Sequence, residues 1–338
     1  MNRNEPDMSS LAPTQPGLTQ LRGPELEGGM EYVSCNLCGR DDTQFLFDGW
    51  DRLHGQPGRF HMVRCRQCGL IYLNPRPLPS QIGRYYPEDY PSYQGSRRSA
   101  QSRVAHRAWR YGVGKRLRAV AAFQPPGRLL DVGCADGAFV AFAREQGWDA
   151  YGVELNPIAA AFCRDTLNLP VITGDLLQAA YPPAYFDGVT LWSVLEHLHD
   201  PMAALREIHR ILRPGGLVVL ATPNPRSVDA RLFGPAWVGY DMPRHLYIFP
   251  DEVLEQMLSQ TGFRILERRC FFGGQALFFL SLYYFWQDRP RQQWMQRWVQ
   301  RLEKSWLVRA VTIPYFFLID KMGAGPIATV FARRESAP

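Results

Sequence analysis

Two pairs of cysteines with the same spacing stand near the start of the chain. Cys35 and Cys38 form one C-x-x-C-G hairpin, and Cys65 and Cys68 form the other. A two-residue spacer lets both thiolates face one ion, and the glycine that follows permits a tight turn whose amides hydrogen-bond to sulfur. Four such sulfurs fit a closed tetrahedral zinc site, which favours a structural role. A redox dithiol is the weaker alternative because the same motif occurs twice.

A glycine-containing turn after an apolar strand is the second chemical feature. The stretch 129–139 reads Leu-Leu-Asp-Val-Gly-Cys-Ala-Asp-Gly-Ala-Phe. Glycine lets the backbone pass close to a ligand because no Cβ stands in the way. Asp131 and Asp136 place negative charge beside this turn. That charge suits a cationic ligand and disfavours a diphosphate.

This turn resembles the first motif of class I S-adenosylmethionine-dependent methyltransferases, written D-x-G-x-G-x-G. Asp131, Gly133 and Gly137 match the motif, and Ala135 replaces its middle glycine. Alanine is the next smallest residue, so the departure raises the strain on the turn only slightly. The resemblance implies a Rossmann-like fold, S-adenosylmethionine as cofactor and methyl transfer by in-line displacement.

Further motifs follow in the order expected for that family. Glu154 ends the second predicted strand, where a carboxylate can accept hydrogen bonds from both ribose hydroxyls of the cofactor. Asp175 follows the third strand, where the family places the contact to the adenine amino group, and a Leu-Arg-Pro-Gly-Gly turn at 212–216 precedes the fifth. The predicted cofactor-binding residues are Asp131, Gly133, Ala135, Gly137, Glu154, Asp175, Leu176 and Trp192.

Two other functions compete with this interpretation. An NAD-dependent oxidoreductase would need Gly-x-Gly-x-x-Gly directly after the strand, and the Gly-Cys-Ala-Asp-Gly turn at 133–137 lacks that spacing. A catalytically inactive scaffold that only binds S-adenosylmethionine is the second alternative. The intact acidic residues Asp131, Glu154 and Asp175 argue against it.

The cysteine-containing stretch carries a resemblance of its own. Residues 63–77 resemble the zinc-binding domain found ahead of a group of bacterial methyltransferases, whose members often modify sugars, polysaccharide precursors or other secondary metabolites. The two resemblances together cover most of residues 31–270. They imply structural zinc and a small-molecule acceptor: a sugar, a polysaccharide precursor, a lipid or a secondary metabolite. A nucleic-acid-binding ribbon is the alternative for this module, but no nucleic acid is expected because only charge favours it.

Two histidines are candidates for proton transfer. His197 comes just after the fourth predicted strand, at the edge where open α/β sheets bind ligands. In the family this histidine more often shapes the cofactor pocket. His245 lies between the fifth strand and a helix, with Tyr240 and Asp241 nearby and Arg244 available for an anionic group. We hypothesise that His245 is the general base, with His197 and Tyr240 as further catalytic candidates. The alternative for this segment is a packing element with a hydrogen-bonded histidine.

The elements that position these residues follow from an alternation of short apolar runs and helical stretches, which predicts a parallel sheet covered on both faces. We predict an α/β fold: a Rossmann-like doubly wound sheet, mostly parallel with an antiparallel last strand, preceded by a small zinc-ribbon-like module. The predicted strands are 128–132, 150–154, 171–173, 188–192, 217–221, 263–267 and 327–332, and the predicted helices are 139–146, 202–212 and 251–260.

Changes of composition along the chain suggest its organisation. The predicted parts are a disordered tail (1–30), a zinc-binding module (31–80), a connector with an arginine-rich amphipathic helix (81–125), a methyltransferase domain (126–270 plus 325–335) and an aromatic-rich helical insertion or lid (271–324). In the insertion, Trp294, Trp298, Leu302 and Trp306 recur at helical spacing. A lid packed on the core, a pocket for a lipophilic substrate and an in-plane membrane contact are all compatible with that pattern.

Composition restricts the setting in which the protein works. Hydrophobic residues make up 46% and charged residues 21% of the 338 residues, as in ordinary soluble domains. The sequence has no apolar run long enough for a membrane span and no secretory leader, so we expect a cytoplasmic location, with possible peripheral membrane contact. The net charge of +6 is modest and comes mainly from arginine clusters. Seven cysteines, an odd number, argue against a disulfide framework.

Overall fold

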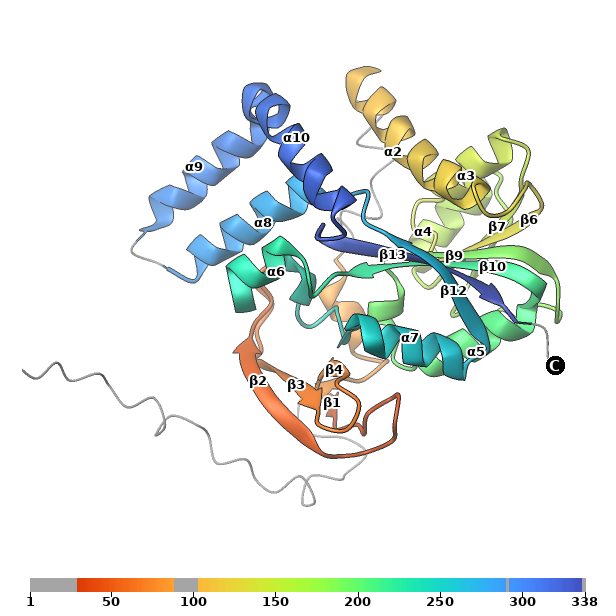
Figure 1. Ribbon diagram of the computed structural model, residues 1–338, viewed down its shortest axis with the longest axis horizontal. Coiled ribbons are helices and arrows are strands. Elements are labelled where there is room, and N and C mark those ends of the chain that lie inside the picture. The colour runs from red at the N-terminus through yellow and green to blue at the C-terminus, as the bar shows by residue number, and fades with distance from the viewer. Residues whose placement is uncertain (1–28, 88–102, 290–291, 336–338) are drawn as a thin grey trace, which may run out of the picture.

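A seven-stranded sheet forms the centre of the computed structural model, which describes residues 29–87, 103–289 and 292–335. Its strand order is β12-β13-β10-β9-β6-β7-β8 (Figure 1). β13 is antiparallel to both of its neighbours, and the remaining strands run parallel to one another. The predicted Rossmann-like sheet with an antiparallel last strand is therefore confirmed. The strands are β6 (Arg128–Val132), β7 (Asp149–Glu154), β8 (Val171–Thr173), β9 (Phe186–Trp192), β10 (Leu212–Pro223), β12 (Phe263–Arg269) and β13 (Ile327–Arg334).

Helices cover both faces of this sheet, which is why its middle strands are mainly apolar. Successive residues of a strand point to opposite faces. On β10, Leu217 and Val219 enter one hydrophobic core, and Val218 and Leu220 enter the other. The helices α2 (Arg103–Ala121), α3 (Ala138–Glu145) and α4 (Pro157–Ala161) lie on one face, and α5 (Pro201–Ile211) and α7 (Asp251–Gln260) lie on the other (Figure 1).

The cysteine-containing segment folds as a smaller sheet against the larger one. Its strand order is β11-β4-β3-β2, and a short β1-β5 pair lies beside it. β11 comes from the chain after β10, and its Tyr247 pairs with Tyr72 of β4. The small sheet is therefore completed by a segment from the other part of the chain, and one hydrophobic core runs through both. The strands are β1 (Met30–Glu31), β2 (Thr43–Gly49), β3 (Phe60–Cys65), β4 (Ile71–Leu73), β5 (Arg76–Pro77) and β11 (Tyr247–Ile248).

A buried ion pair joins the two parts. Arg244 is fully buried and donates hydrogen bonds to Asp241 at 2.9 and 2.7 Å and to Asp51 at 2.8 Å. It also donates to the carbonyl of Tyr85 at 3.2 Å. The sequence suggested that Arg244 could hold an anionic group of a ligand. That suggestion is wrong, because the guanidinium is enclosed by carboxylates of the chain itself.

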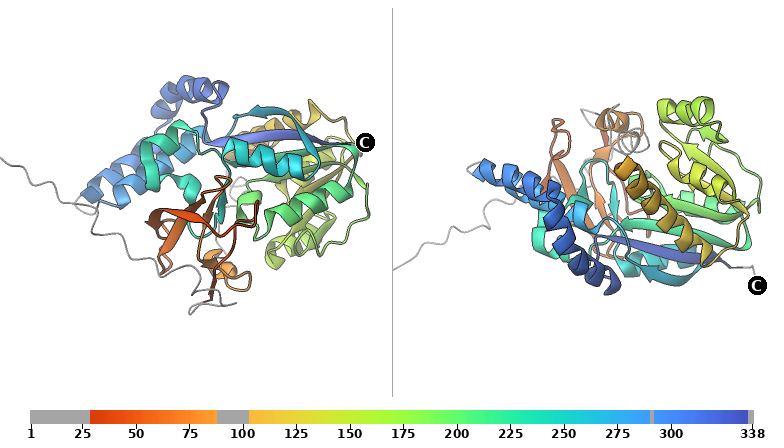
Figure 2. Two further views of the ribbon diagram at one scale, coloured as in Figure 1. Left: turned by 60° about the horizontal axis from the view of Figure 1, so that its bottom comes forward. Right: turned by 90° about the horizontal axis from the view of Figure 1, so that it is seen from above.

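The aromatic-rich stretch folds into helices at the edge of the molecule (Figures 1 and 2). Within α8, Phe279 and Tyr284 are buried, while Trp294, Trp298 and Trp306 further along are more than half exposed. No helix in the described ranges is both long enough and apolar enough to cross a membrane. The helices of this stretch are α8 (Gly274–Gln287), α9 (Gln293–Lys304) and α10 (Trp306–Lys321), and α6 (Val228–Phe233), from the chain before β12, packs against α8.

Replacing Arg244 by leucine should lower the free energy of unfolding by about 3–5 kcal/mol, because Asp51 and Asp241 would be left buried without a counter-charge. Equilibrium unfolding in urea measures this loss. The matched control is Arg226→Leu, since Arg226 is exposed and pairs with Asp251 and Glu252 at the surface. The control should cost no more than about 1 kcal/mol. If Arg244→Leu lowered the free energy of unfolding as little as the control does, the buried pair would not hold the two parts together.

Candidate functional site

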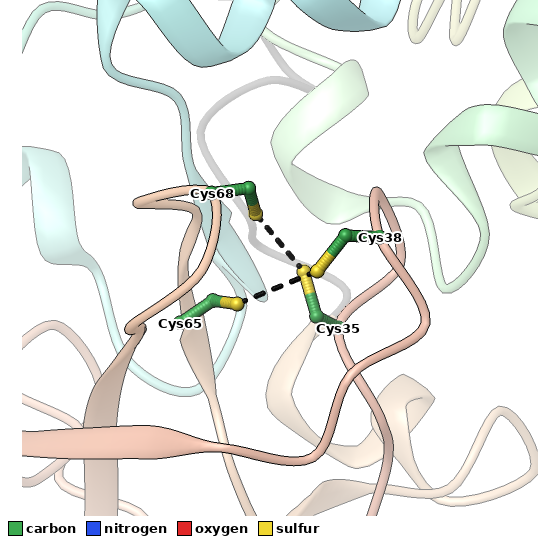
Figure 3. Close-up of side chains that lie close together, drawn as sticks. All are labelled: Cys35, Cys38, Cys65 and Cys68. Atoms are coloured by element: carbon green, nitrogen blue, oxygen red, sulfur yellow. Dashed lines mark hydrogen bonds between the residues drawn. The ribbon is translucent and has the colours of Figure 1, made fainter.

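The four cysteines of the two hairpins converge on one point (Figure 3). The sulfur of Cys35 lies 3.4 Å from that of Cys68, and the sulfur of Cys38 lies 3.5 Å from that of Cys65. Both distances are far longer than the ~2.05 Å of a disulfide bond. They are close to the ~3.8 Å that separates two sulfurs each ~2.3 Å from a tetrahedral zinc ion. The cluster has the donor set and the spacing of a structural zinc site.

The backbone of the hairpins supports that geometry. In each, the amide of the glycine, Gly39 or Gly69, donates to the carbonyl of the first cysteine at 2.8 or 3.0 Å. Both glycines have positive φ, at 71° and 81°. This conformation favours glycine and closes the tight turn that brings the two sulfurs of a hairpin together.

The predicted cofactor turn lies between β6 and α3, at the carboxyl edge of the large sheet. Gly133, Ala135 and Gly137 have φ of 68°, 50° and 74°. Ala135 is therefore held in the left-handed region, where alanine is less favourable than glycine, as the departure from the motif implies. A Cβ at Gly133 would lie 2.7 Å from the side chain of Val194, and one at Gly137 would lie 2.8 Å from the sulfur of Cys163.

Glu154 ties this turn to the neighbouring strand. It ends β7, is 5% exposed, and accepts hydrogen bonds from the amides of Ala135 and Asn156, both at 2.8 Å. A carboxylate oxygen has a second lone pair, so each oxygen can still accept a hydroxyl donor. Burial raises the pKa of Glu154, while these amide bonds act in the opposite direction.

Asp131 lies under the turn, where burial raises its pKa to about 7. The Thr190 hydroxyl donates to its carboxylate at 2.7 Å, and this bond and the charge of Arg116 offset part of the rise. Arg116, from α2, also lies 5.4 Å from the ring of Trp192. The region of the turn thus holds a cation that interacts electrostatically with Asp131 and Asp136.

Three further predicted residues lie at the ends of the next strands. Asp175 is partly exposed after β8, and its carboxylate caps the following turn by accepting from the amide of Gln178 at 2.8 Å. Leu176 beside it is buried. Trp192 ends β9 with its ring against Phe139, and its indole nitrogen is buried without a hydrogen-bond partner among the described residues. These residues and the turn all belong to the carboxyl edge of the sheet.

Beside this edge, the structure brings together His197, His245 and Glu196. One ligand atom from each lies within 4.8 Å of the others. His197 lies in the short helical turn Leu195–His197, and its ring centroid is 4.6 Å from that of His245. Glu196 is fully buried, and burial raises its pKa to about 8. Burial, together with its neighbour, lowers the pKa of His197 to about 3, and burial also lowers that of His245. Both rings are therefore neutral at pH 7.

Tyr240, the third predicted catalytic residue, is not one of this cluster. It ends the short helical turn Val238–Tyr240, and its ring packs edge-on against Trp237 at 5.2 Å and against Phe47 of β2 at 4.7 Å. Burial raises its pKa. Tyr240 therefore belongs to the contact between the small sheet and the segment that carries His245.

Sequence reasoning missed two residues of this region. Glu196 precedes His197, and a Glu-His pair directly after the fourth strand was a signal that could have been followed. Arg116 was hidden among many arginines of an amphipathic helix, and only the fold reveals that it faces the acidic turn.

Comparison with known proteins assigns this geometry to a class. A family described as "Methyltransferase domain" matches residues 103–268. The malonyl-[acyl-carrier protein] O-methyltransferase of Serratia marcescens is 32% identical over 153 residues, 45% of this chain and 59% of that protein. The ubiquinone biosynthesis O-methyltransferase of Pseudomonas aeruginosa is 29% identical over 131 residues, 36% of this chain and 56% of that protein. The chain thus spans less than two thirds of the length of these two relatives.

Two other similarities accompany these. The demethylmenaquinone methyltransferase of Staphylococcus saprophyticus is 25% identical over 202 residues, 52% of this chain and 85% of that protein. A solved S-adenosylmethionine-dependent methyltransferase from Archaeoglobus fulgidus aligns at 21% identity with a TM-score of 0.45, covering 66% of this chain and 94% of that chain.

The matched segment runs from α2 to β12 and includes the whole acidic turn region. Residues 103–268 therefore form a class I S-adenosylmethionine-dependent methyltransferase domain. The predicted class of enzyme is confirmed, and the match assigns the domain to methyl transfer rather than to NAD-dependent oxidoreduction.

Proposed function

We propose that this protein transfers a methyl group from S-adenosylmethionine to a small-molecule acceptor. The arrangement at the carboxyl edge of the sheet carries the proposal, because Asp131 and Glu154 lie at the ends of β6 and β7 and Asp175 follows β8. Glu154 would accept hydrogen bonds from the ribose hydroxyls, and Asp175 would accept one from the adenine amino group. Leu176 would flank the base, and Trp192 would lie beside Arg116 at the other end of the cofactor. When bound, the cofactor supplies an electrophilic methyl group on a sulfonium.

The chemistry of these donors fits that cofactor. The ligand carries cationic groups and no phosphate, and the turn offers acidic side chains beside backbone with positive φ. The guanidinium of Arg116 lies among Asp131, Asp136 and Trp192, where it can meet the one anionic group of the cofactor, its carboxylate. The protein's main tasks are to align the reacting groups and to exclude water.

We propose that the acceptor is a small molecule with a hydroxyl group or an activated carbon. The relatives are named for malonyl-[acyl-carrier protein], demethylmenaquinone and ubiquinone biosynthesis, which differ widely in structure. The resemblance of the N-terminal module adds sugars and polysaccharide precursors to this range. A hydroxyl group or an activated carbon must lose a proton when it is methylated.

We assign removal of the acceptor's proton to His245. Its Nδ1 lies 2.7 Å from the carbonyl of Gly239, which can only accept, so Nδ1 carries the hydrogen and Nε2 is the basic atom. His197 beside it shapes the pocket, and its Nδ1 lies 2.8 Å from the hydroxyl of Tyr86 and 3.0 Å from the carbonyl of Arg244. The four cysteines hold a structural zinc ion that supports the small sheet carrying Asp51 and Tyr72.

Calorimetry should detect binding of S-adenosylmethionine and of its demethylated product to the purified protein, but no binding of NAD. Asp175→Asn should weaken cofactor affinity about tenfold or more, because a hydrogen bond to a charged group is worth about 1.5–3 kcal/mol. Asp165→Asn is the matched control, since Asp165 is exposed in the helical segment Phe162–Thr166 before β8. Metal analysis of the same sample should find zinc at one ion per four-cysteine cluster. Preference for NAD, or no binding, would refute the proposal.

His245→Ala should lower the rate of methyl transfer about 10²–10⁴-fold while leaving cofactor affinity unchanged, because general-base catalysis typically contributes that much. Single-turnover kinetics with radiolabelled cofactor measures the rate, and calorimetry measures the affinity. His209→Ala is the control, since His209 lies on α5 and packs against Phe263, away from the cluster. An unchanged rate in the His245 variant would exclude it as the base.

We also propose peripheral contact of α9 and α10 with anionic membranes. Trp294, Trp298 and Trp306 are exposed beside the exposed cations Arg297 and Arg301. Aromatic side chains with interleaved cations suit an anionic interface.

The protein should sediment with phosphatidylserine vesicles at low salt and much less with neutral vesicles. The Trp294→Ser, Trp298→Ser double variant should lose most of this binding. Failure of the unaltered protein to sediment would remove the membrane contact.

A further inference from the structure

The carboxylate of Glu196 is an unusual buried group. The side chain is fully buried, and neither of its oxygens has a hydrogen-bond partner among the described residues. A buried polar group without a partner costs free energy, so such groups in folded proteins are normally satisfied by a donor, a water or an ion. Both oxygens of Glu196 are available to a group that the chain itself does not supply.

Both histidines beside Glu196 have a backbone carbonyl at Nδ1. Nδ1 of His245 lies 2.7 Å from the carbonyl of Gly239, and Nδ1 of His197 lies 3.0 Å from the carbonyl of Arg244 and 2.8 Å from the hydroxyl of Tyr86. A carbonyl can only accept, so Nδ1 of His245 carries the hydrogen and its Nε2 keeps a lone pair. The same tautomer of His197 donates to the Arg244 carbonyl and leaves its Nε2 with a lone pair. This is the arrangement of metal-binding histidines, whose second nitrogen donates to a carbonyl or carboxylate that orients the ring.

The buried charges around the cluster are unbalanced. Asp51 and Asp241 share the single guanidinium of Arg244. Two carboxylates against one guanidinium leave an excess of one negative charge beside the cluster, and a cation bound at Glu196 would meet that excess.

We propose that Glu196, His197 and His245 bind one divalent transition-metal ion, with the two Nε2 atoms and a carboxylate oxygen as ligands. Two imidazoles and a carboxylate suit Mn²⁺, Fe²⁺, Co²⁺ or Zn²⁺ rather than Ca²⁺. The three ligand atoms lie within 4.8 Å of one another, so the side chains need only draw together around the ion. Both histidines are partly exposed, which gives the ion a route from solvent and leaves coordination positions open.

This site adjoins the cofactor turn, because Val194, two residues before Glu196, faces Gly133. Its role rests on the proposed methyl transfer. The open positions of the ion bind the acceptor's hydroxyl oxygen and lower the pKa of that hydroxyl, so that its proton leaves to water. The oxygen then forms a bond to the methyl carbon while the carbon–sulfur bond breaks, and the bonding pair neutralises the sulfonium.

The ion also refines the role of His245. With the ion bound, Nε2 of His245 is a ligand, and the acceptor is activated by the metal. Without it, Nε2 is free to take the proton directly. Both arrangements need His245, but only the first needs Glu196 and a metal.

The test uses Mn²⁺, a hard ion that the four thiolates do not favour. The full-length protein, with its zinc content measured, is titrated with Mn²⁺ while the signal of free Mn²⁺ is followed by electron paramagnetic resonance. One Mn²⁺ should bind per chain, and Glu196→Gln should weaken its affinity at least tenfold. His106→Gln is the control, because His106 is exposed on α2, and it should bind like the unaltered protein. This Mn²⁺ titration does not depend on binding of S-adenosylmethionine. A failure of the metal proposal can therefore be told apart from a failure of the proposed methyl transfer.

A second measurement needs no variant. Mn²⁺ should selectively broaden the imidazole proton resonances of His197 and His245 and leave that of His106 sharp. In the methyl-transfer assay, Mn²⁺ should restore the rate lost after chelation in the unaltered protein but not in Glu196→Gln. The proposal is overturned if millimolar Mn²⁺ fails to bind, if it broadens other histidines instead, or if Glu196→Gln binds it equally well.

Discussion

The buried guanidinium of Arg244 is the interaction on which the rest of the site depends. Its bonds to Asp51 and Asp241 fix the small sheet against the segment that follows β10. The carbonyl of the same residue holds Nδ1 of His197, and its neighbour His245 is one of the paired rings. Since an unpaired buried charge is strongly destabilising, the two sheets and the histidine pair are coupled energetically. The part of the chain that carries the cysteine cluster is therefore coupled to the histidine pair through Asp51.

Much of the large sheet could be predicted from the sequence. The strand at 128–132 has the predicted bounds, and the acids that end or follow strands lie at one edge, because the carboxyl ends of parallel strands meet there. One predicted strand boundary was wrong. The strand β10 begins at Leu212 rather than 217, since the Arg-Pro-Gly-Gly segment forms an irregular pairing with β9. Local sequence patterns predict the apolar centre of a strand well, but they do not predict irregular strand ends of this kind.

Contacts distant in sequence could not be foreseen. Tyr247 pairs with Tyr72 across 175 positions, and Asp51 pairs with Arg244 across 193. Nothing in the spacing of Pro-Arg-His-Leu-Tyr at 243–247 shows that its arginine is buried or that its tyrosine belongs to a strand. The same limit applies to Glu196. Its identity is plain in the sequence, but its complete burial and its neighbours depend on the loop from the other side of the site.

The two cysteine hairpins and the histidine–glutamate cluster offer a metal ion very different ligands. Four thiolates with no open position favour a zinc ion that stabilises structure. Two imidazoles and a carboxylate with open positions favour an ion that binds a reactant. The cysteine cluster is supported by tight turns within its own small sheet, whereas the second cluster takes its orientation from carbonyls of Gly239 and Arg244. Because Arg244 is anchored by Asp51, the structural cluster helps to set the geometry at which the second cluster can act.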